Sequence, residues 1–200
     1  MSEFALRPVT LTGEHVRLEP LGMDHVPGLL EAARDEEIWR FLPIEQPATL
    51  AEMENFVKEA LEMQEQGESF PFATLESKGN RVAGSTRYLE IKPAHRGVEI
   101  GFTWLGREFQ RSAINTESKL LLLEHAFEAH GAVRVQLKTD LRNVGSQRAI
   151  ERIGAKREGV LRNHMIVKNG FVRDSVFYSI TATEWPAVKQ ELLRKLKRPA

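Results

Sequence analysis

In this 200-residue chain 28 acidic residues balance 28 basic ones, which excludes the broad basic surface typical of nonspecific nucleic-acid binding. The absence of cysteine excludes disulfides, thiolate zinc sites and a cysteine nucleophile, and the six histidines show no metal-ligand spacing. No apolar run approaches the roughly 20 residues that span a bilayer, and residues 1–9 lack the pattern of a secretory signal. We therefore expect one cytoplasmic domain over residues 1–200, with no metal, membrane or nucleic-acid partner.

The first half of the chain shows the patterns of two helices and four strands. A strand is expected at residues 16–21, helices at 24–33 and 50–66, and an antiparallel meander of strands at 70–76, 82–91 and 97–105. In the last of these, Val98, Ile100, Phe102 and Trp104 alternate with smaller or polar residues. Because side chains alternate between the two faces of a strand, this pattern predicts that all four lie on one buried face.

The second half alternates helices with strands. The patterns predict a helix at residues 116–130, a strand at 133–139, a helix from Asn143 to Gly154, hairpin strands at 160–167 and 174–181, and a helix at 184–197. Gly131 and Gly154 are typical residues at which helices end. The order of elements indicates an α/β fold with a mixed sheet.

The polar stretch at residues 106–115 lies between a strand and a helix. Such a connection directs the unpaired N–H groups at the helix start, and their partial positive charge, toward one point. This geometry suits a pyrophosphate. The alternative is that residues 110–115 only connect the two elements, and composition alone does not decide between the two interpretations.

Asn143 and Ser146 lie three residues apart at the start of the next predicted helix. In one interpretation Asn143 only caps the helix and Ser146 only satisfies a neighbouring N–H group. In the other, the pair contacts a ligand at the helix start. Local sequence does not separate these two.

The order of segments resembles the GNAT acetyltransferases, in particular the branch of the bacterial ribosomal-protein alanine acetyltransferases. The resemblance covers nearly the whole chain, and its motifs are specific only together. They are VRLEPL (16–21), EIGF (99–102), WL (104–105), NTESK (115–119), TDLRNVGS (139–146), AIERIGA (149–155) and RDSVFY (173–178). The resemblance implies a GNAT-like, largely antiparallel central sheet, splayed between its fourth strand (97–105) and fifth strand (133–139) and flanked by helices.

The resemblance also implies that acetyl-coenzyme A binds in the splayed opening. The pantetheine would extend along the fourth strand and the pyrophosphate would lie at the helix start. The implied cofactor-binding residues are Phe102, Thr103, Trp104, Leu105, Gln110, Arg111, Ser112, Ala113, Ile114, Asn115, Thr116, Asn143 and Ser146.

This chain departs from the family's phosphate loop at both glycine positions, which are Ala113 and Asn115 here. Alanine is close in size to glycine where φ is negative, and asparagine tolerates positive φ better than most residues. We therefore expect the loop to bind the cofactor. The alternative is a chain that keeps the fold and binds coenzyme A poorly.

Two catalytic roles are carried over from the family. Ser146 would protonate the leaving thiolate, because the position where many relatives have a tyrosine for this step is Ile150 here. Glu99 is the leading general base, although a solvated charge is an equally good interpretation of it. Asp174 and His164 are weaker candidates, and a water chain is an alternative to all of them; Tyr178 is expected in the core or at a pocket wall.

The function expected from the resemblance is acetyl transfer to a primary amine by direct attack on the thioester. The acceptor is a protein or peptide N-terminus or a small-molecule amine, and a homodimer is one expectation for the oligomeric state. The alternative, from another class, is a coenzyme A-binding or structural interaction module. Trp39, Phe41 and Phe72 would line an acceptor pocket or belong to the core, and we favour the core.

Overall fold

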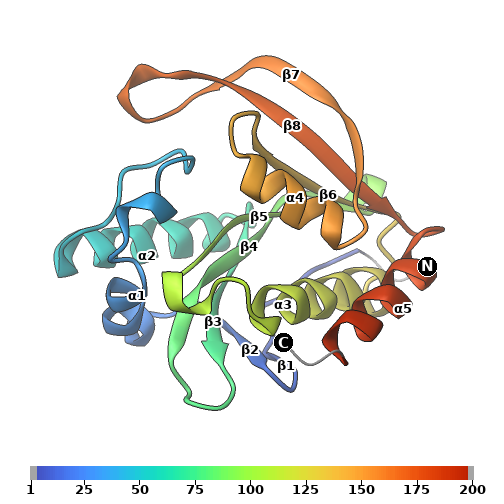
Figure 1. The fold of residues 1–200 in the computed structure, drawn as a ribbon, viewed down its shortest axis with the longest axis horizontal. Helices are drawn as coiled ribbons and strands as arrows, with labels where there is room; N and C mark the ends of the chain where they lie inside the picture. The colour runs from blue at the N-terminus through green and yellow to red at the C-terminus, as the bar shows by residue number, and fades with distance from the viewer. Residues whose placement is uncertain (1–3, 198–200) are drawn as a thin grey trace.

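The computed structural model describes residues 4–197, in which eight strands form one sheet (Figure 1). The strands are β1 (Leu11–Thr12), β2 (Val16–Pro20), β3 (Phe70–Glu76), β4 (Val82–Lys92), β5 (Gly97–Leu105), β6 (Arg134–Asp140), β7 (Lys156–Ile166) and β8 (Val172–Thr181). The α-helices are α1 (Val26–Ala32), α2 (Leu50–Glu65), α3 (Ala113–Glu124), α4 (Val144–Arg152) and α5 (Trp185–Leu196). No helix within residues 4–197 has the length and apolar character needed to cross a bilayer.

The sheet has the strand order β1-β2-β3-β4-β5-β6-β8-β7. All neighbouring strands pair antiparallel except β5 and β6, which are parallel. This arrangement confirms the predicted mixed, largely antiparallel sheet and the predicted meander of β3, β4 and β5.

The sheet opens between β5 and β6, as the resemblance implied. The two strands pair only from Gly97 to Glu99 on β5 and from Arg134 to Gln136 on β6. Beyond this point β6 continues to pair with β8 as far as Asp140, while β5 remains paired with β4 on its other side. The edge of β5 that faces β6 therefore leaves backbone N–H and C=O groups available to another extended chain.

Helices cover both faces of the sheet and form two separate cores. Residues of α3, α4 and α5 pack on one face in a cluster that includes Val98 and Ile100 of β5. Residues of α1 and α2 pack on the other face in a cluster that includes Trp104. In Figure 1, β3 and β4 lie between α1 and α2 on one side and α3 and α5 on the other.

The predicted shared face of Val98, Ile100, Phe102 and Trp104 is wrong, because a β-bulge interrupts β5. Ser85 of β4 pairs with Trp104 and Arg87 pairs with Gly101, so Thr86 alone lies opposite two residues of β5. Phe102 adopts a left-handed backbone with φ of +50°. One extra residue reverses the alternation, so Val98 and Ile100 face α3 whereas Phe102 and Trp104 face α2.

The predicted start of the main helix at Thr116 is also wrong, by three residues. The helix α3 begins at Ala113 because Ser112 caps it, with its Oγ accepting a hydrogen bond from the Ile114 N–H at 3.3 Å. After Glu124 the chain continues through a π-helical turn, His125–Ala129. The loop before α3 is therefore shorter than predicted, and more of the predicted loop residues belong to the first helical turn.

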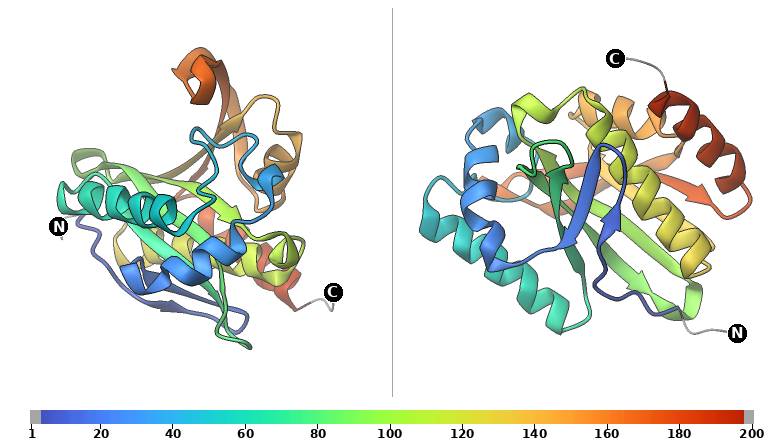
Figure 2. Two further views of the ribbon diagram at one scale, coloured as in Figure 1. Left: turned by 90° about the vertical axis from the view of Figure 1, so that its left-hand side faces the viewer. Right: turned by 90° about the horizontal axis from the view of Figure 1, so that it is seen from below.

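The remaining boundaries differ less from the predictions. The first predicted helix divides into a 3₁₀ turn, Met23–His25, and α1, which has proline in its first turn. The closing hairpin was predicted too short, since β7 and β8 have 11 and 10 residues. This hairpin arches over one side of the fold and stands out from it in the left view of Figure 2.

Candidate active site

The first turn of α3 lies after β5 and follows a short polar loop. Arg111 in this loop has φ of +59°, and Gln110 Nε2 donates to the Leu105 carbonyl at 3.0 Å. The first N–H groups of a helix have no intrahelical partner and attract anions. The end of β5 and the start of α3 therefore form a cradle with the geometry that suits a pyrophosphate.

Both departures from the family's loop glycines lie inside the helix. Ala113 and Asn115 have helical backbone, so neither position requires a residue that tolerates positive φ. The expected tolerance of asparagine for positive φ is therefore not needed at Asn115. The residue that adopts positive φ in this loop is Arg111.

The NTESK motif supports the fold around this cradle. Glu117 is buried and accepts the N–H groups of Glu14, His15 and Val16 at 3.0, 2.6 and 2.8 Å. Ser118 Oγ donates to the Ile114 carbonyl at 2.7 Å. The motif thus ties the β1–β2 turn to α3, which lies beside it in the right view of Figure 2.

Asn143 caps α4, and Ser146 keeps its hydroxyl available. Asn143 Oδ1 accepts the Ser146 N–H at 2.9 Å, as the capping interpretation predicts. Within residues 4–197, the Ser146 hydroxyl and the Asn143 amide nitrogen make no hydrogen bond. Both groups remain available to a ligand at the start of α4.

Glu99 lies at the base of the opening, at the last paired position of β5 and β6. Its side chain is 1% exposed, and its carboxylate accepts from Lys138 Nζ and Gln136 Nε2, each at 2.8 Å. The alternative that Glu99 is a solvated charge is therefore wrong. Both carboxylate oxygens of Glu99 are thus already engaged by side chains of β6.

His164 of β7 and Lys138 of β6 lie on the same face of the sheet, with β8 between their two strands. Its Nδ1 lies 3.0 Å from Ser175 Oγ, and its ring contacts Phe177 edge-on at 5.1 Å, next to the position where Phe177 pairs with Lys138. Burial and then the charges of Lys138 and Arg173 lower the pKa of His164, while Glu99 and Glu90 act in the opposite direction. A neutral imidazole is therefore the prevailing form near pH 7.

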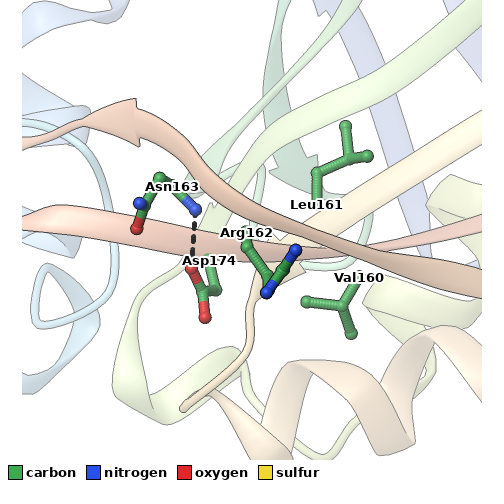
Figure 3. Close-up of a pocket in the computed structure, with 5 residues that line it drawn as sticks. All are labelled: Val160, Leu161, Arg162, Asn163 and Asp174. Atoms are coloured by element: carbon green, nitrogen blue, oxygen red, sulfur yellow. Dashed lines mark hydrogen bonds between the residues drawn. The ribbon is translucent and has the colours of Figure 1, made fainter.

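Asp174 and Tyr178 do not belong to the cluster formed by Glu99, Lys138 and His164. Asp174 Oδ1 accepts the Asn163 N–H at 2.7 Å inside the β7–β8 hairpin (Figure 3). Together with Val160, Leu161 and Arg162, these two residues line the open hollow of about 690 Å³ that Figure 3 shows. Tyr178 is fully buried and its hydroxyl lies 3.1 Å from Glu151 of α4, so the prediction of a core position is confirmed.

A second, smaller hollow lies between the loop before α2 and the tip of the hairpin. It has a volume of about 170 Å³, and the guanidinium of Arg142 lies there over the rings of Phe171 and Phe41, at 3.8 and 5.7 Å. Arg142 also pairs with the buried Asp140 at 2.7 Å. Trp39 and Phe72 belong to the core as predicted, whereas Phe41 lines this hollow.

Residues 4–197 contain no cluster of three histidine, cysteine, aspartate or glutamate side chains that would hold a metal ion. The features that remain are an unpaired strand edge, an anion cradle, a serine hydroxyl and two proton acceptors. This combination suits the binding of an extended, phosphate-bearing ligand.

Comparison with known proteins decides the family. The model of the acetyltransferase (GNAT) domain matches residues 15–156. The chain belongs to the GNAT acetyltransferases. A GCN5-related N-acetyltransferase from Brucella melitensis is 32% identical, with a TM-score of 0.90 over 96% of this chain and 86% of that chain.

Two further similar proteins are informative. The Bacillus subtilis (strain 168) protein named "Putative ribosomal N-acetyltransferase YdaF" is 36% identical over 108 residues, which are 54% of this chain and 58% of that protein. The alignment thus spans little more than half of YdaF. Mycobacterium smegmatis RimJ, solved in complex with CoA-disulfide, has a TM-score of 0.83 over 98% of this chain and 97% of that chain, at 19% identity, which shows the GNAT fold alone.

Proposed function

We propose that this GNAT chain transfers the acetyl group of acetyl-coenzyme A to a primary amine by direct attack of the amine on the thioester. The observation that carries this proposal is the unpaired edge of β5, which leads from the bulge at Phe102 directly to the cradle at the start of α3. An extended pantetheine bearing a pyrophosphate matches both features. Mycobacterium smegmatis RimJ, which has the same fold, was solved in complex with CoA-disulfide, and this supports the assignment by fold.

In this proposal the backbone of Phe102, Thr103, Trp104 and Leu105 binds the pantetheine, and residues 110–116 bind the pyrophosphate. Acetyl-coenzyme A supplies an activated acyl group with a thiolate as the leaving group. The left-handed backbone at Phe102 breaks the regular β4–β5 ladder, and we propose that an N–H group of this bulge faces the opening. An N–H group in this position is suited to stabilise the charge that develops on the thioester oxygen.

Ser146 is the proposed donor of the proton that the thiolate takes up. Its hydroxyl makes no hydrogen bond within residues 4–197, and the Asn143 cap holds its backbone at the start of α4. Ile150, at the position of the family's tyrosine, has no group that donates a proton. Ser146 therefore remains the best placed donor on this helix.

Two side chains near the opening are able to accept the proton of the amine, namely Glu99 and His164. Glu99 is buried, and both of its carboxylate oxygens already accept hydrogen bonds from Lys138 and Gln136. His164 has a lowered pKa and stays neutral near pH 7. We therefore propose that His164 accepts the proton and that Glu99 orients Lys138 and Gln136 at the base of the opening.

The proposed acceptor is the N-terminal amine of a protein or peptide in the cytoplasm. The name of YdaF supports this class, and an acceptor that crosses the hollow around Arg142 would have room for residues after the amine. Small-molecule amines are the alternative class. The acceptor panel in the experiment below separates the two.

The test is release of free thiol from acetyl-coenzyme A in the presence of a mixed panel of peptides and small amines. We expect acceptor-dependent thiol release and a higher thermal midpoint with acetyl-coenzyme A, since a ligand at 100 times its Kd adds about 2.7 kcal/mol of stability. Desulfo-coenzyme A should stabilise the protein to a similar extent. An unmoved midpoint together with no calorimetric binding would contradict the cofactor assignment, and binding without thiol release would favour an interaction module.

A further inference from the structure

Two buried cations lie on opposite faces of the sheet at the β5 bulge. Thr86 and Arg87 are consecutive on β4 and therefore point to opposite faces. Thr86 faces Lys119 of α3, and Arg87 faces Phe56 of α2. The bulge residues Phe102 and Thr103 lie between the two cations, because they pair across from Thr86.

Lys119 lies beside Thr103 and has no acidic partner in the part of the chain that the structure describes. Its side chain is 5% exposed, and Nζ donates to Thr103 Oγ1 at 2.7 Å and to Thr86 Oγ1 at 3.2 Å. No salt bridge among residues 4–197 includes Lys119. Burial alone lowers its pKa to about 7.

Arg87 lies over Phe102 on the other face. Its side chain is 4% exposed, and the guanidinium lies 4.5 Å from the centre of the Phe102 ring and 4.9 Å from that of Phe56. Its Nε is buried and has no hydrogen-bond partner among residues 4–197, and Nη1 lies 4.0 Å from Met63 Sδ. Burial lowers the pKa of Arg87 to about 10, and the exposed Glu59, at a distance beyond ion pairing, acts in the opposite direction.

Buried cations without a counter-charge are costly, and folding alone gives no reason to keep two of them at one place. Both side chains approach the residues whose backbone faces the proposed thioester site. We therefore expect the negative charge that balances these two cations to arise during the reaction. The oxygen of the thioester gains this charge as the amine attacks.

We infer that Arg87 and Lys119 are positioning residues that act through the bulge, supplying positive potential from both faces of the sheet to the thioester oxygen. This inference rests on the proposed function. Lys119 acts through Thr103, whose hydroxyl it holds, and Arg87 acts through the ring of Phe102. Neither side chain contacts the acyl group.

The direct readout is the infrared stretching frequency of acetyl-coenzyme A labelled with ¹³C at the thioester carbonyl and bound to the protein. A positive potential at the oxygen polarises the carbonyl and lowers this frequency relative to the free ligand. We expect Lys119→Met and Arg87→Met each to return the frequency toward the free value. Matched controls are Lys58→Met, a surface lysine of α2, and Arg81→Met, whose exposed guanidinium lies over the Phe109 ring but pairs with Glu76 and Glu108.

Turnover is measured on the same preparations, with kcat expressed per calorimetric coenzyme A-binding site so that unfolded protein does not count. We expect kcat to fall about 10-fold to 100-fold in each variant while the Kd for coenzyme A stays within about 3-fold. Loss of the buried charge should leave the thermal midpoint of Lys119→Met unchanged or higher. A merely structural lysine predicts a lower midpoint with unchanged kcat.

The wild-type protein provides a test that needs no variant. As pH rises from 6 to 8, Lys119 loses its proton and the carbonyl frequency should rise, and Lys119→Met should abolish this change. The neighbouring Tyr88 and His125 keep their protonation states over this range, because burial raises the pKa of Tyr88 and lowers that of His125 to about 4.

The following results would overturn the inference. A bound carbonyl at the free frequency, a frequency unmoved in both variants, or an unchanged kcat per binding site overturns this inference alone. Failure of the wild-type protein to bind coenzyme A overturns the proposed function and this inference together.

Discussion

Gly13 lies directly against the carboxylate of Glu117: a Cβ placed on Gly13 would overlap Glu117 Cδ. The absence of a side chain at Gly13 lets the β1–β2 turn close around this carboxylate, which accepts three successive backbone N–H groups. A residue in the middle of the sequence motif of α3 therefore holds together the N-terminal edge of the sheet.

We expect Glu117→Gln to lower the free energy of unfolding by about 1.5–3 kcal/mol, because charge-assisted hydrogen bonds are lost and buried N–H groups keep weaker partners. Gly13→Ala should cost about 1–3 kcal/mol by overpacking. Urea unfolding measures both. The control is Glu65→Gln, an exposed carboxylate of α2 that should be neutral; equal midpoints for all variants would contradict a structural role of Glu117.

Ser146→Ala should lower kcat by about 10-fold to 1000-fold, the scale of one general-acid contact, with affinity for acetyl-coenzyme A within a few-fold. If Ser146 only supports the first turn of α4, the variant should instead lose stability on the order of 1 kcal/mol and keep its turnover. Single-turnover rate and melting temperature on one preparation distinguish these results. Full turnover in a stable variant would assign the proton to another donor.

Ala113→Glu should weaken coenzyme A binding, because a carboxylate in the first turn of α3 would face the pyrophosphate at the positive end of the helix. An acidic residue is otherwise favourable in a first helical turn, so the fold should remain intact by circular dichroism. Calorimetry with coenzyme A is the measurement. Unchanged affinity would mean that the phosphates bind elsewhere.

Lys119 should make stability depend on pH in the neutral to alkaline range. Its pKa is about 7 in the folded protein and near 10.5 when exposed, so the unfolded chain binds more protons between these values. Stability therefore rises with pH from about 7 toward 10.5, and below pH 7 the buried charge costs on the order of a few kcal/mol. Lys119→Met should thus be most stabilising relative to wild type at pH 6 and least so at pH 10, in urea titrations at each pH.

His125 should contribute to acid unfolding. Burial, and then the charge of His130, lowers its pKa to about 4 from an ordinary 6.5. Its contribution to stability is fully present above pH 6.5 and is lost as pH falls to about 4, because the unfolded chain takes up the proton first. His125→Gln should therefore reduce the loss of folding stability between pH 6.5 and about 4. The control is His95→Gln, at an exposed histidine. An equal loss of stability at acid pH in both variants would contradict the assignment to His125.

Local patterns in the sequence were sufficient for most elements of the fold. Asn143 was predicted to cap α4, and the hydrogen bond from Ser146 is present, because a cap depends on residues only three positions apart. The meander and the splayed sheet also followed, from segment order and the family resemblance. The polar loop between β5 and α3 is present as predicted, although the helix begins at Ala113 rather than Thr116.

Only the tertiary structure decided which side chains meet. The alternating pattern of β5 runs unbroken through Phe102, and only pairing with Thr86 of β4 shows that one residue is extra and that the faces exchange. The burial of Lys119 beside Thr103, and the position of His164 on the surface that carries Lys138, join residues 16 and 26 positions apart. Periodicity and capping describe neighbours along the chain, whereas these contacts depend on strand register and on the path of the β7–β8 hairpin, which packing of the whole chain determines.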